Sequence, residues 1–203
     1  MSEQRDVPKA SCELEQWVLV EVGKRRRSGE AVSAMLAGVG AETQALRMAG
    51  AGARVLLLSD KPVDAHPEVS RLPFAGNADS DEPLPREPFD IILSQRTLCG
   101  LRYEEARRKL RRLMQRLKIG GKLFISLYGI HSELGDHYAD GSKLVNDRFA
   151  PLAPALAERY GLPGPVCLYS ERNLFSLLME AGGAVIKTST SALGHVRGIA
   201  ARV

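Results

Sequence analysis

Continuous apolar runs of strand length constrain the fold of this chain more than any other sequence feature. Four such runs cover Ala31–Ala37, Arg54–Ser59 (RVLLLS), Phe89–Ser94 (FDIILS) and Lys122–Tyr128 (KLFISLY). Strands that are buried on both faces read in this way, whereas half-exposed strands alternate apolar and polar residues. Helical segments with glycines at the junctions separate the runs, so we expect an α/β fold with a doubly wound, mostly parallel sheet.

Helical periodicity is strongest in Tyr103–Lys118, and Gly120-Gly121 is expected to end that helix. A weak strand is expected around Glu68–Phe74. The late runs Ala184–Ser189 and His195–Val203 are joined by a short link and must therefore form an antiparallel hairpin, because a parallel pair needs a long crossover. Further helices are expected at Glu13–Arg27, Ala41–Met48, Leu152–Tyr160 and Glu171–Ala181.

Length and composition favour one globular domain over residues 13–203, preceded by a polar, flexible segment at 1–12. No apolar run approaches the roughly 20 residues of a membrane helix. The 3 cysteines are far apart, and no His or Cys spacing indicates a metal site. We therefore expect a cytoplasmic protein without a membrane partner. The net charge of +4 permits an anionic partner without requiring one.

Two junctions carry residues suited to a nucleotide-like ligand. Gly38 and Gly40 follow the first strand and open a helix, so backbone N–H groups and the helix N-terminus can approach an anionic or polar group. Asp60 follows the second strand, where a carboxylate can accept hydrogen bonds from both hydroxyls of a ribose. Together these features predict a ligand crevice at the carboxyl ends of the strands.

The combination resembles class I S-adenosylmethionine-dependent methyltransferases over most of the chain. The matching segments are AMLAGVGAETQALRMAGAGARVLLLSD, PFDIILSQRTLCGL, LRRLMQRLKIGGKLFISLYG and LYSERNLFSLLMEAGGAVIKTST. The resemblance implies a Rossmann-like sheet of the seven-stranded type with an antiparallel C-terminal hairpin. It also implies S-adenosylmethionine as cofactor and methyl transfer to a small molecule as the reaction.

The resemblance further implies individual cofactor contacts. Ala37, Gly38 and Gly40 would flank the methionine and ribose portions, and Asp60 would bind the ribose hydroxyls. The turn Asn77-Ala78-Asp79 would contact adenine through Ala78 and Asp79. Ser94 and Gln95 would lie near the transferred methyl group.

Two positions depart from the family pattern. The family carries an acidic residue where this chain has Leu36, and a third glycine where this chain has Glu42. Glu42 either replaces the missing acid as a partner of the cofactor's amino group or obstructs the pocket. A second glycine-bearing stretch, Val20–Gly23, contains an acid but lies too far from Asp60 for one strand–helix–strand unit.

Catalytic candidates follow the fourth and fifth strands. His131 is the best candidate base, with Tyr128 and His137 as lesser ones, and Arg96 is suited to an anionic substrate group. Residues 129–168 form a candidate substrate lid. The segment after Ile92 reads LSQRT rather than the Asn/Asp-Pro-Pro-aromatic motif of enzymes that methylate nucleic-acid amines, which disfavours that substrate class.

Two alternatives remain open. Leu36 and Glu42 are consistent with a catalytically silent methyltransferase-like module that serves a protein partner. The basic run Lys24–Arg27 and the basic face of the 103–118 helix are consistent with an RNA methyltransferase. A nucleic-acid partner is disfavoured because aromatic residues total 5% and a solvated helix face explains the charges better. The oligomeric state is left open.

Overall fold

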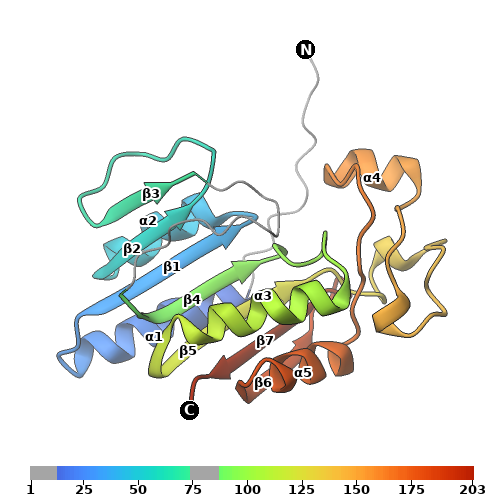
Figure 1. Cartoon of the computed structure of the whole chain (residues 1–203). Helices are drawn as coiled ribbons and strands as arrows, with labels where there is room; N and C mark the ends of the chain where they lie inside the picture. Colours follow the sequence, from blue (N-terminus) through green and yellow to red (C-terminus); the bar gives the residue numbers. More distant parts are fainter. Residues whose placement is uncertain (1–12, 74–86) are drawn as a thin grey trace.

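The computed structural model describes residues 13–73 and 87–203, which contain a seven-stranded sheet in the order β3-β2-β1-β4-β5-β7-β6 (Figure 1). The expected flexible segment 1–12 and the expected adenine turn at 77–79 lie outside the described residues. The strands are β1 (Val32–Gly38), β2 (Ala53–Leu58), β3 (Val69–Leu72), β4 (Phe89–Gln95), β5 (Leu117–Leu127), β6 (Ala184–Thr190) and β7 (Val196–Ala201).

Strand directions confirm the predicted topology. Strands β1 to β5 pair in parallel, whereas β7 pairs antiparallel with both β5 and β6. The chain order reverses between β1 and β4, which are neighbours in the sheet although β2 and β3 intervene in sequence. Such a reversal leaves a crevice at the carboxyl ends of the two strands, because their following segments turn to opposite sides.

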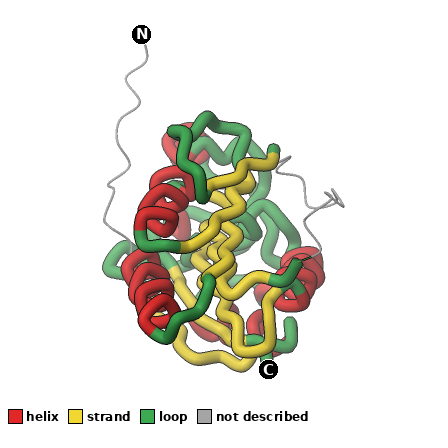
Figure 2. Tube along the Cα trace, turned by 90° about the vertical axis from the view of Figure 1, so that its left-hand side faces the viewer, coloured by secondary structure: helices red, strands yellow, loops and turns green. Residues whose placement is uncertain are grey.

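Helices cover both faces of the sheet (Figure 2). One face packs against α1 and α2 through residues such as Leu14, Leu36 and Met48, and the other packs against α3 and α5 through residues such as Met35, Leu110 and Leu177. Met35 faces one core and Leu36 faces the other, which is the reason that β1 carries apolar residues on both faces. The helices are α1 (Glu13–Arg27), α2 (Ala41–Gly50), α3 (Tyr103–Gln115), α4 (Pro154–Tyr160) and α5 (Glu171–Glu180), with 3-10 turns η1 (Glu133–Gly135) and η2 (Val145–Asp147).

The prediction that α3 extends to Lys118 is wrong. The helix ends at Gln115, and β5 begins at Leu117, which pairs with Phe89. The Phe89 amide donates to the Arg116 carbonyl at 2.8 Å, so sheet pairing takes over before the glycines are reached. Gly120 and Gly121 lie inside β5, where the register against β4 shifts and Gly120 has a φ of +76°.

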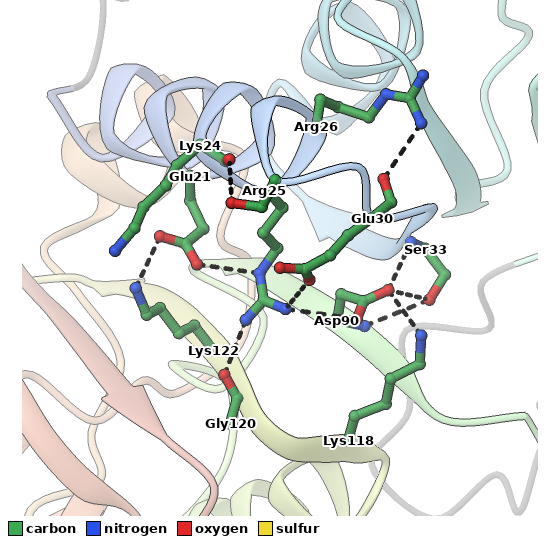
Figure 3. A network of polar contacts seen from close by, with 11 residues as sticks. Glu21, Lys24, Arg25, Arg26, Glu30, Ser33, Asp90, Lys118, Gly120 and Lys122 are labelled. Carbon is green, nitrogen blue, oxygen red and sulfur yellow. Dashed lines mark hydrogen bonds and ion pairs between the residues drawn. The ribbon is translucent and has the colours of Figure 1, made fainter.

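A polar network ties α1 to the amino-terminal ends of β4 and β5 (Figure 3). The Arg25 guanidinium contacts Glu21 at 3.0 Å and Asp90 at 3.5 Å, and donates to the Gly120 carbonyl at 2.8 Å. Asp90 also accepts from the Ser33 amide at 2.8 Å and pairs with Lys118 at 2.8 Å. A shallow hollow of about 270 Å³ beside Arg25 belongs to this network and lies at the end of the sheet opposite the crevice.

Candidate active site

The crevice begins where β1 and β4 end side by side, at the register pair Gly38 and Gln95. Gly38 has a φ of +102°, and a Cβ built on it would lie 1.9 Å from the Gln95 carbonyl oxygen. The Val39 amide donates to the same oxygen at 3.1 Å. Only glycine fits this position, and the close approach of β4 is sufficient reason for it.

Gly40 occupies a different environment. It precedes α2 with a φ of +75°, and no side chain caps the helix there. The nearest atom to a Cβ built on Gly40 is the Glu15 Oε1 oxygen at 3.7 Å. The bend therefore places the uncapped N-terminus of α2 close to the Glu15 carboxylate, and helix N-termini favour anionic or polar ligands.

Glu15 and Gln95 meet in this crevice, and the sequence analysis did not include Glu15. The Gln95 amide nitrogen donates to Glu15 Oε1 at 3.2 Å, and the second Glu15 oxygen lies 3.6 Å from Arg47 Nη1. Gln95 is 5% exposed, and its Oε1 has no hydrogen-bond partner among the described residues. The only sequence signal for Glu15 was its place in the acidic first turn of α1.

The two departures from the family pattern have separate structural positions. Leu36 is fully buried and packs with Leu14 and Val18 of α1, so the position that carries the family's acid is part of the core here. Glu42 accepts a hydrogen bond from Ser59 Oγ at 2.5 Å, which directs its carboxylate to the end of β2. Asp60 is the next residue after Ser59 and is exposed.

Of the other predicted cofactor contacts, Ala37 and Ser94 are register partners at the ends of β1 and β4. Ala37 is partly buried and packs against the core on the α3 face. Ser94 is buried, and its hydroxyl lies 2.6 Å from the Thr97 hydroxyl. The Ser94 hydroxyl is thus engaged inside the protein, whereas the Oε1 oxygen of Gln95 has no partner in the described ranges.

A second cluster forms where β4 and β5 end. Arg96 has a φ of +62°, and its guanidinium carbon lies 5.0 Å from the centroid of the Tyr128 ring. The edge-to-face neighbours of Tyr128 are Tyr160 at 6.0 Å and His195 at 5.5 Å between centroids. Sequence reasoning assigned His195 only to a strand and Tyr160 only to a helix. Their convergence on Tyr128 depends on tertiary packing.

Electrostatics in this cluster fix two protonation states. Burial raises the pKa of the Tyr128 hydroxyl, and the opposing influence of Arg96 does not reverse the shift. Burial, reinforced by Arg96, lowers the pKa of His195 to about 4. At neutral pH, Tyr128 is therefore a phenol that can donate a hydrogen bond, and His195 is a neutral imidazole whose Nδ1 accepts from the Gly129 amide at 3.4 Å.

The predicted lid segment, residues 129–168, contains α4 and two 3-10 turns (Figure 1), and Tyr160 of α4 contacts Tyr128. Glu133 pairs with Arg159 at 2.9 Å and accepts a hydrogen bond from the Tyr160 hydroxyl. The Tyr138 hydroxyl donates to the Val166 carbonyl at 2.5 Å, which helps to close the segment on itself. The candidate bases His131 and His137 are exposed in the same segment.

Known structures share this architecture, although no protein-family model and no curated sequence matches the chain. The 1,6-didemethyltoxoflavin-N1-methyltransferase of Burkholderia thailandensis, solved with that compound and S-adenosylhomocysteine, is similar with a TM-score of 0.65 at 15% identity, covering 98% of this chain and 82% of that one. This chain has the class I S-adenosylmethionine-dependent methyltransferase fold.

Two further methyltransferase structures support the same fold. Magnesium protoporphyrin IX methyltransferase of Synechocystis PCC 6803, with bound S-adenosylhomocysteine, gives a TM-score of 0.59 at 18% identity, covering 93% of this chain and 83% of that one. The CcbJ methyltransferase of Streptomyces caelestis gives a TM-score of 0.60 at 17% identity, covering 94% and 89%. Identities this low establish the methyltransferase fold and leave the substrate open.

Basic side chains on the exposed face of α3 form ion pairs and hydrogen bonds with neighbouring residues. Arg107 pairs with Glu104 at 2.5 Å, and Arg111 donates to the Glu180 carbonyl at 2.9 Å.

Within residues 13–73 and 87–203, no helix combines the length and apolar character needed to cross a membrane. The same two ranges contain no group of three or more His, Cys, Asp or Glu side chains placed to hold a metal ion.

Proposed function

We propose that this protein transfers the methyl group of S-adenosylmethionine to a small molecule. The observation that carries the proposal lies at the ends of β1 and β4, beside Glu15 and the Gly40 bend, where the buried side-chain Oε1 oxygen of Gln95 has no hydrogen-bond partner among residues 13–73 and 87–203. A buried unpaired acceptor marks a place where a ligand donor is expected. The methyltransferase structures named above that contain S-adenosylhomocysteine support the same ligand class.

The described residues fit such a cofactor. Gly40 and the uncapped N-terminus of α2 would border its amino-acid portion. Asp60 would accept hydrogen bonds from the ribose hydroxyls, and Glu42, held by Ser59 at the same strand end, would lie beside it. Gln95 would lie near the methyl group. Ala78 and Asp79 retain their proposed adenine contacts, which fall outside the described residues.

The bound cofactor supplies an electrophilic methyl group, and the protein's own residues position the acceptor. Methyl transfer forms a bond between the acceptor atom and the methyl carbon while the carbon–sulfur bond breaks, so the acceptor must approach in line. Arg96 would hold an anionic or carbonyl group of the substrate, and protonated Tyr128 would donate a hydrogen bond to it. If the acceptor carries a proton, His131 would be the base, because it follows β5 closely and its imidazole is exposed within the 129–168 segment.

The 129–168 segment would act as the substrate lid. Tyr160 of α4 contacts Tyr128, so α4 borders the space that a substrate held by Arg96 would occupy. Aromatic walls of this kind suit a planar or apolar small molecule with one polar group. A small-molecule acceptor also agrees with the engaged basic residues of α3, which leave less charge for a nucleic-acid backbone.

Isothermal titration with S-adenosylhomocysteine tests the proposal. We expect binding by the wild-type protein and a loss of affinity of at least about tenfold in Asp60→Ala, since a ribose would lose a charged acceptor. Asp64→Ala removes a nearby exposed carboxylate and should leave the affinity unchanged. Absence of binding by the wild-type protein at millimolar ligand would refute the proposal.

A catalytically silent methyltransferase-like module is the second candidate. It is favoured by the burial of Leu36 and by the Glu42–Ser59 contact, which places a side chain where the family has a glycine. Glu42→Gly separates the two candidates. S-adenosylhomocysteine binding that appears only in this variant would support the silent module, whereas binding by the wild-type protein would support the enzyme.

A further inference from the structure

We propose that Glu15 and Gln95 together form the binding site for the cofactor's amino-acid ammonium group. This inference rests on the proposed function, because it assigns one part of the same ligand. Glu15 reaches the crevice from α1, and Gln95 reaches it from the end of β4. Glu15 thereby provides the carboxylate that position 36 of β1 lacks.

The orientation of Gln95 is the first step. Its amide nitrogen donates to Glu15 Oε1 at 3.2 Å, and the reverse orientation would place two oxygens against each other. The Gln95 Oε1 oxygen, the other polar atom of the amide, is therefore left for a ligand, and within the described part of the chain it is buried without a hydrogen-bond partner. Leaving such an acceptor unpaired is unfavourable, so the site favours a ligand that donates a hydrogen bond.

The charge of the site is the second step. A carboxylate and a carbonyl oxygen, both acceptors, are best matched by an ammonium group, which has three donors and a positive charge. Arg47 lies 3.6 Å from the Oε2 oxygen of Glu15, but 45% of its side chain is exposed, so it neutralises the outer side of the carboxylate. The Oε1 oxygen, which Gln95 contacts, faces the bend.

Access from the ligand side is the third step. Glu15 Oε1 is the nearest atom to the place where a Cβ of residue 40 would be, at 3.7 Å. Glycine at that position leaves the oxygen open toward the crevice. Leu36 points to the same face of the sheet as α1 and packs with Leu14 and Val18. The helix therefore delivers a carboxylate on the face where the strand itself has an apolar side chain.

A matched pair of ligands isolates the ammonium contact. S-adenosylhomocysteine carries the amino-acid group, whereas 5′-methylthioadenosine keeps the nucleoside and the thioether and lacks the ammonium. Both are titrated calorimetrically into the wild-type protein and into Glu15→Gln. We expect Glu15→Gln to lower the affinity for S-adenosylhomocysteine at least about tenfold and to change the affinity for 5′-methylthioadenosine less than about twofold.

Controls keep the result interpretable. Glu13→Gln removes another carboxylate from the first turn of α1, which pairs with Arg197 at 2.9 Å, and should change neither affinity. Gln95→Met removes the Oε1 oxygen without leaving a new polar group in the core. It should also lower the affinity for S-adenosylhomocysteine more than that for 5′-methylthioadenosine. Melting temperatures of all variants verify folding, and Gln95→Met preserves the test if Glu15→Gln does not fold.

The outcomes separate this inference from the proposed function. Equal weakening of both ligands by Glu15→Gln and Gln95→Met, or weakening of neither, would refute the ammonium site while leaving cofactor binding intact. Failure of the wild-type protein to bind either ligand would refute the proposed function, and this inference with it. Selective weakening of S-adenosylhomocysteine supports both.

Discussion

The Gln95 amide nitrogen donates a hydrogen bond to Glu15 Oε1 across 3.2 Å, which joins the end of the central strand β4 to the first turn of α1. The two residues are 80 positions apart in the chain. The other polar atom of the Gln95 side chain, Oε1, has no hydrogen-bond partner in the part of the chain that the structure describes. The relationship links the packing of α1, which the core dictates, to the proposed recognition of the cofactor.

The two glycines of the bend should respond differently to substitution. Gly38→Ala should lower the free energy of unfolding by about 3–5 kcal/mol, because its Cβ would collide with the Gln95 carbonyl at 1.9 Å. Gly40→Ala should cost only about 1–2 kcal/mol for its left-handed conformation, since the nearest atom is 3.7 Å away. Urea denaturation of both variants measures the difference. Equal losses would contradict the packing described for Gly38.

Acid should weaken the network around Asp90. Burial alone would raise the pKa of Asp90, but hydrogen bonds from Lys118 and Ser33 outweigh it and hold the pKa below the ordinary 3.8. Since the folded state favours the ionised form, this stabilisation is complete above pH 3.8 and is lost as the pH falls through the lower folded value.

Asp90→Asn should therefore lower the free energy of unfolding by about 2 kcal/mol at pH 6 and by much less at the acid end. Urea titrations from pH 6 to about pH 2 measure the gap between variant and wild type. Glu30→Gln, which removes a half-exposed partner of Arg25, should cost under about 0.5 kcal/mol. A gap for Asp90→Asn that does not depend on pH would contradict the assigned pairing.

His195 should make the fold sensitive to mild acid. Its pKa is lowered from 6.5 to about 4 by burial and Arg96, so the unfolded state binds the proton more readily. Stability is complete above pH 6.5 and declines as the pH falls toward 4, by about 2 kcal/mol once solvent screening is allowed for.

Thermal melts between pH 7.5 and 4.5 test the His195 prediction. The melting temperature of His195→Gln should depend less on pH than that of the wild-type protein. His131→Gln, an exposed histidine of the lid segment, provides the control and should behave as wild type. An NMR titration that gave His195 an ordinary pKa near 6.5 would overturn the prediction directly.

Substitution of Arg96 should reduce methyl transfer to the acceptor and leave the affinity for the cofactor unchanged. Arg96→Gln should reduce methyl transfer to carboxylate-bearing small molecules at least about tenfold while changing S-adenosylhomocysteine affinity less than about twofold. Transfer of radiolabelled methyl groups to a panel of such acids measures the first, and calorimetry the second. Arg102→Gln is a matched control, because Arg102 also stacks over a ring, that of Phe149 at 4.9 Å. Unchanged transfer in Arg96→Gln would exclude its substrate role.

The sheet and its order of elements were predictable because burial leaves a local signature. Strands that are covered on both faces carry mostly apolar residues. Arg54–Ser59 and Phe89–Ser94 can therefore be recognised as strands from their own sequence alone. The end of α3 was not predictable in this way. Leu117 fits the helical periodicity, and only its pairing with Phe89 assigns it to β5. Hydrogen bonds to a distant strand decided that boundary.

The sequence by itself determined the doubly wound, mostly parallel sheet and the bend at Gly38 and Gly40, because hydrophobic period and glycine backbone freedom are properties of neighbouring residues. Tertiary structure alone decided which side chains meet at the crevice. Glu15 joins Gln95, and His195 joins Tyr128, across stretches of chain that no local pattern connects. Side chains converge only when the core fixes the helices and loops against the strand ends, and that packing depends on the whole chain.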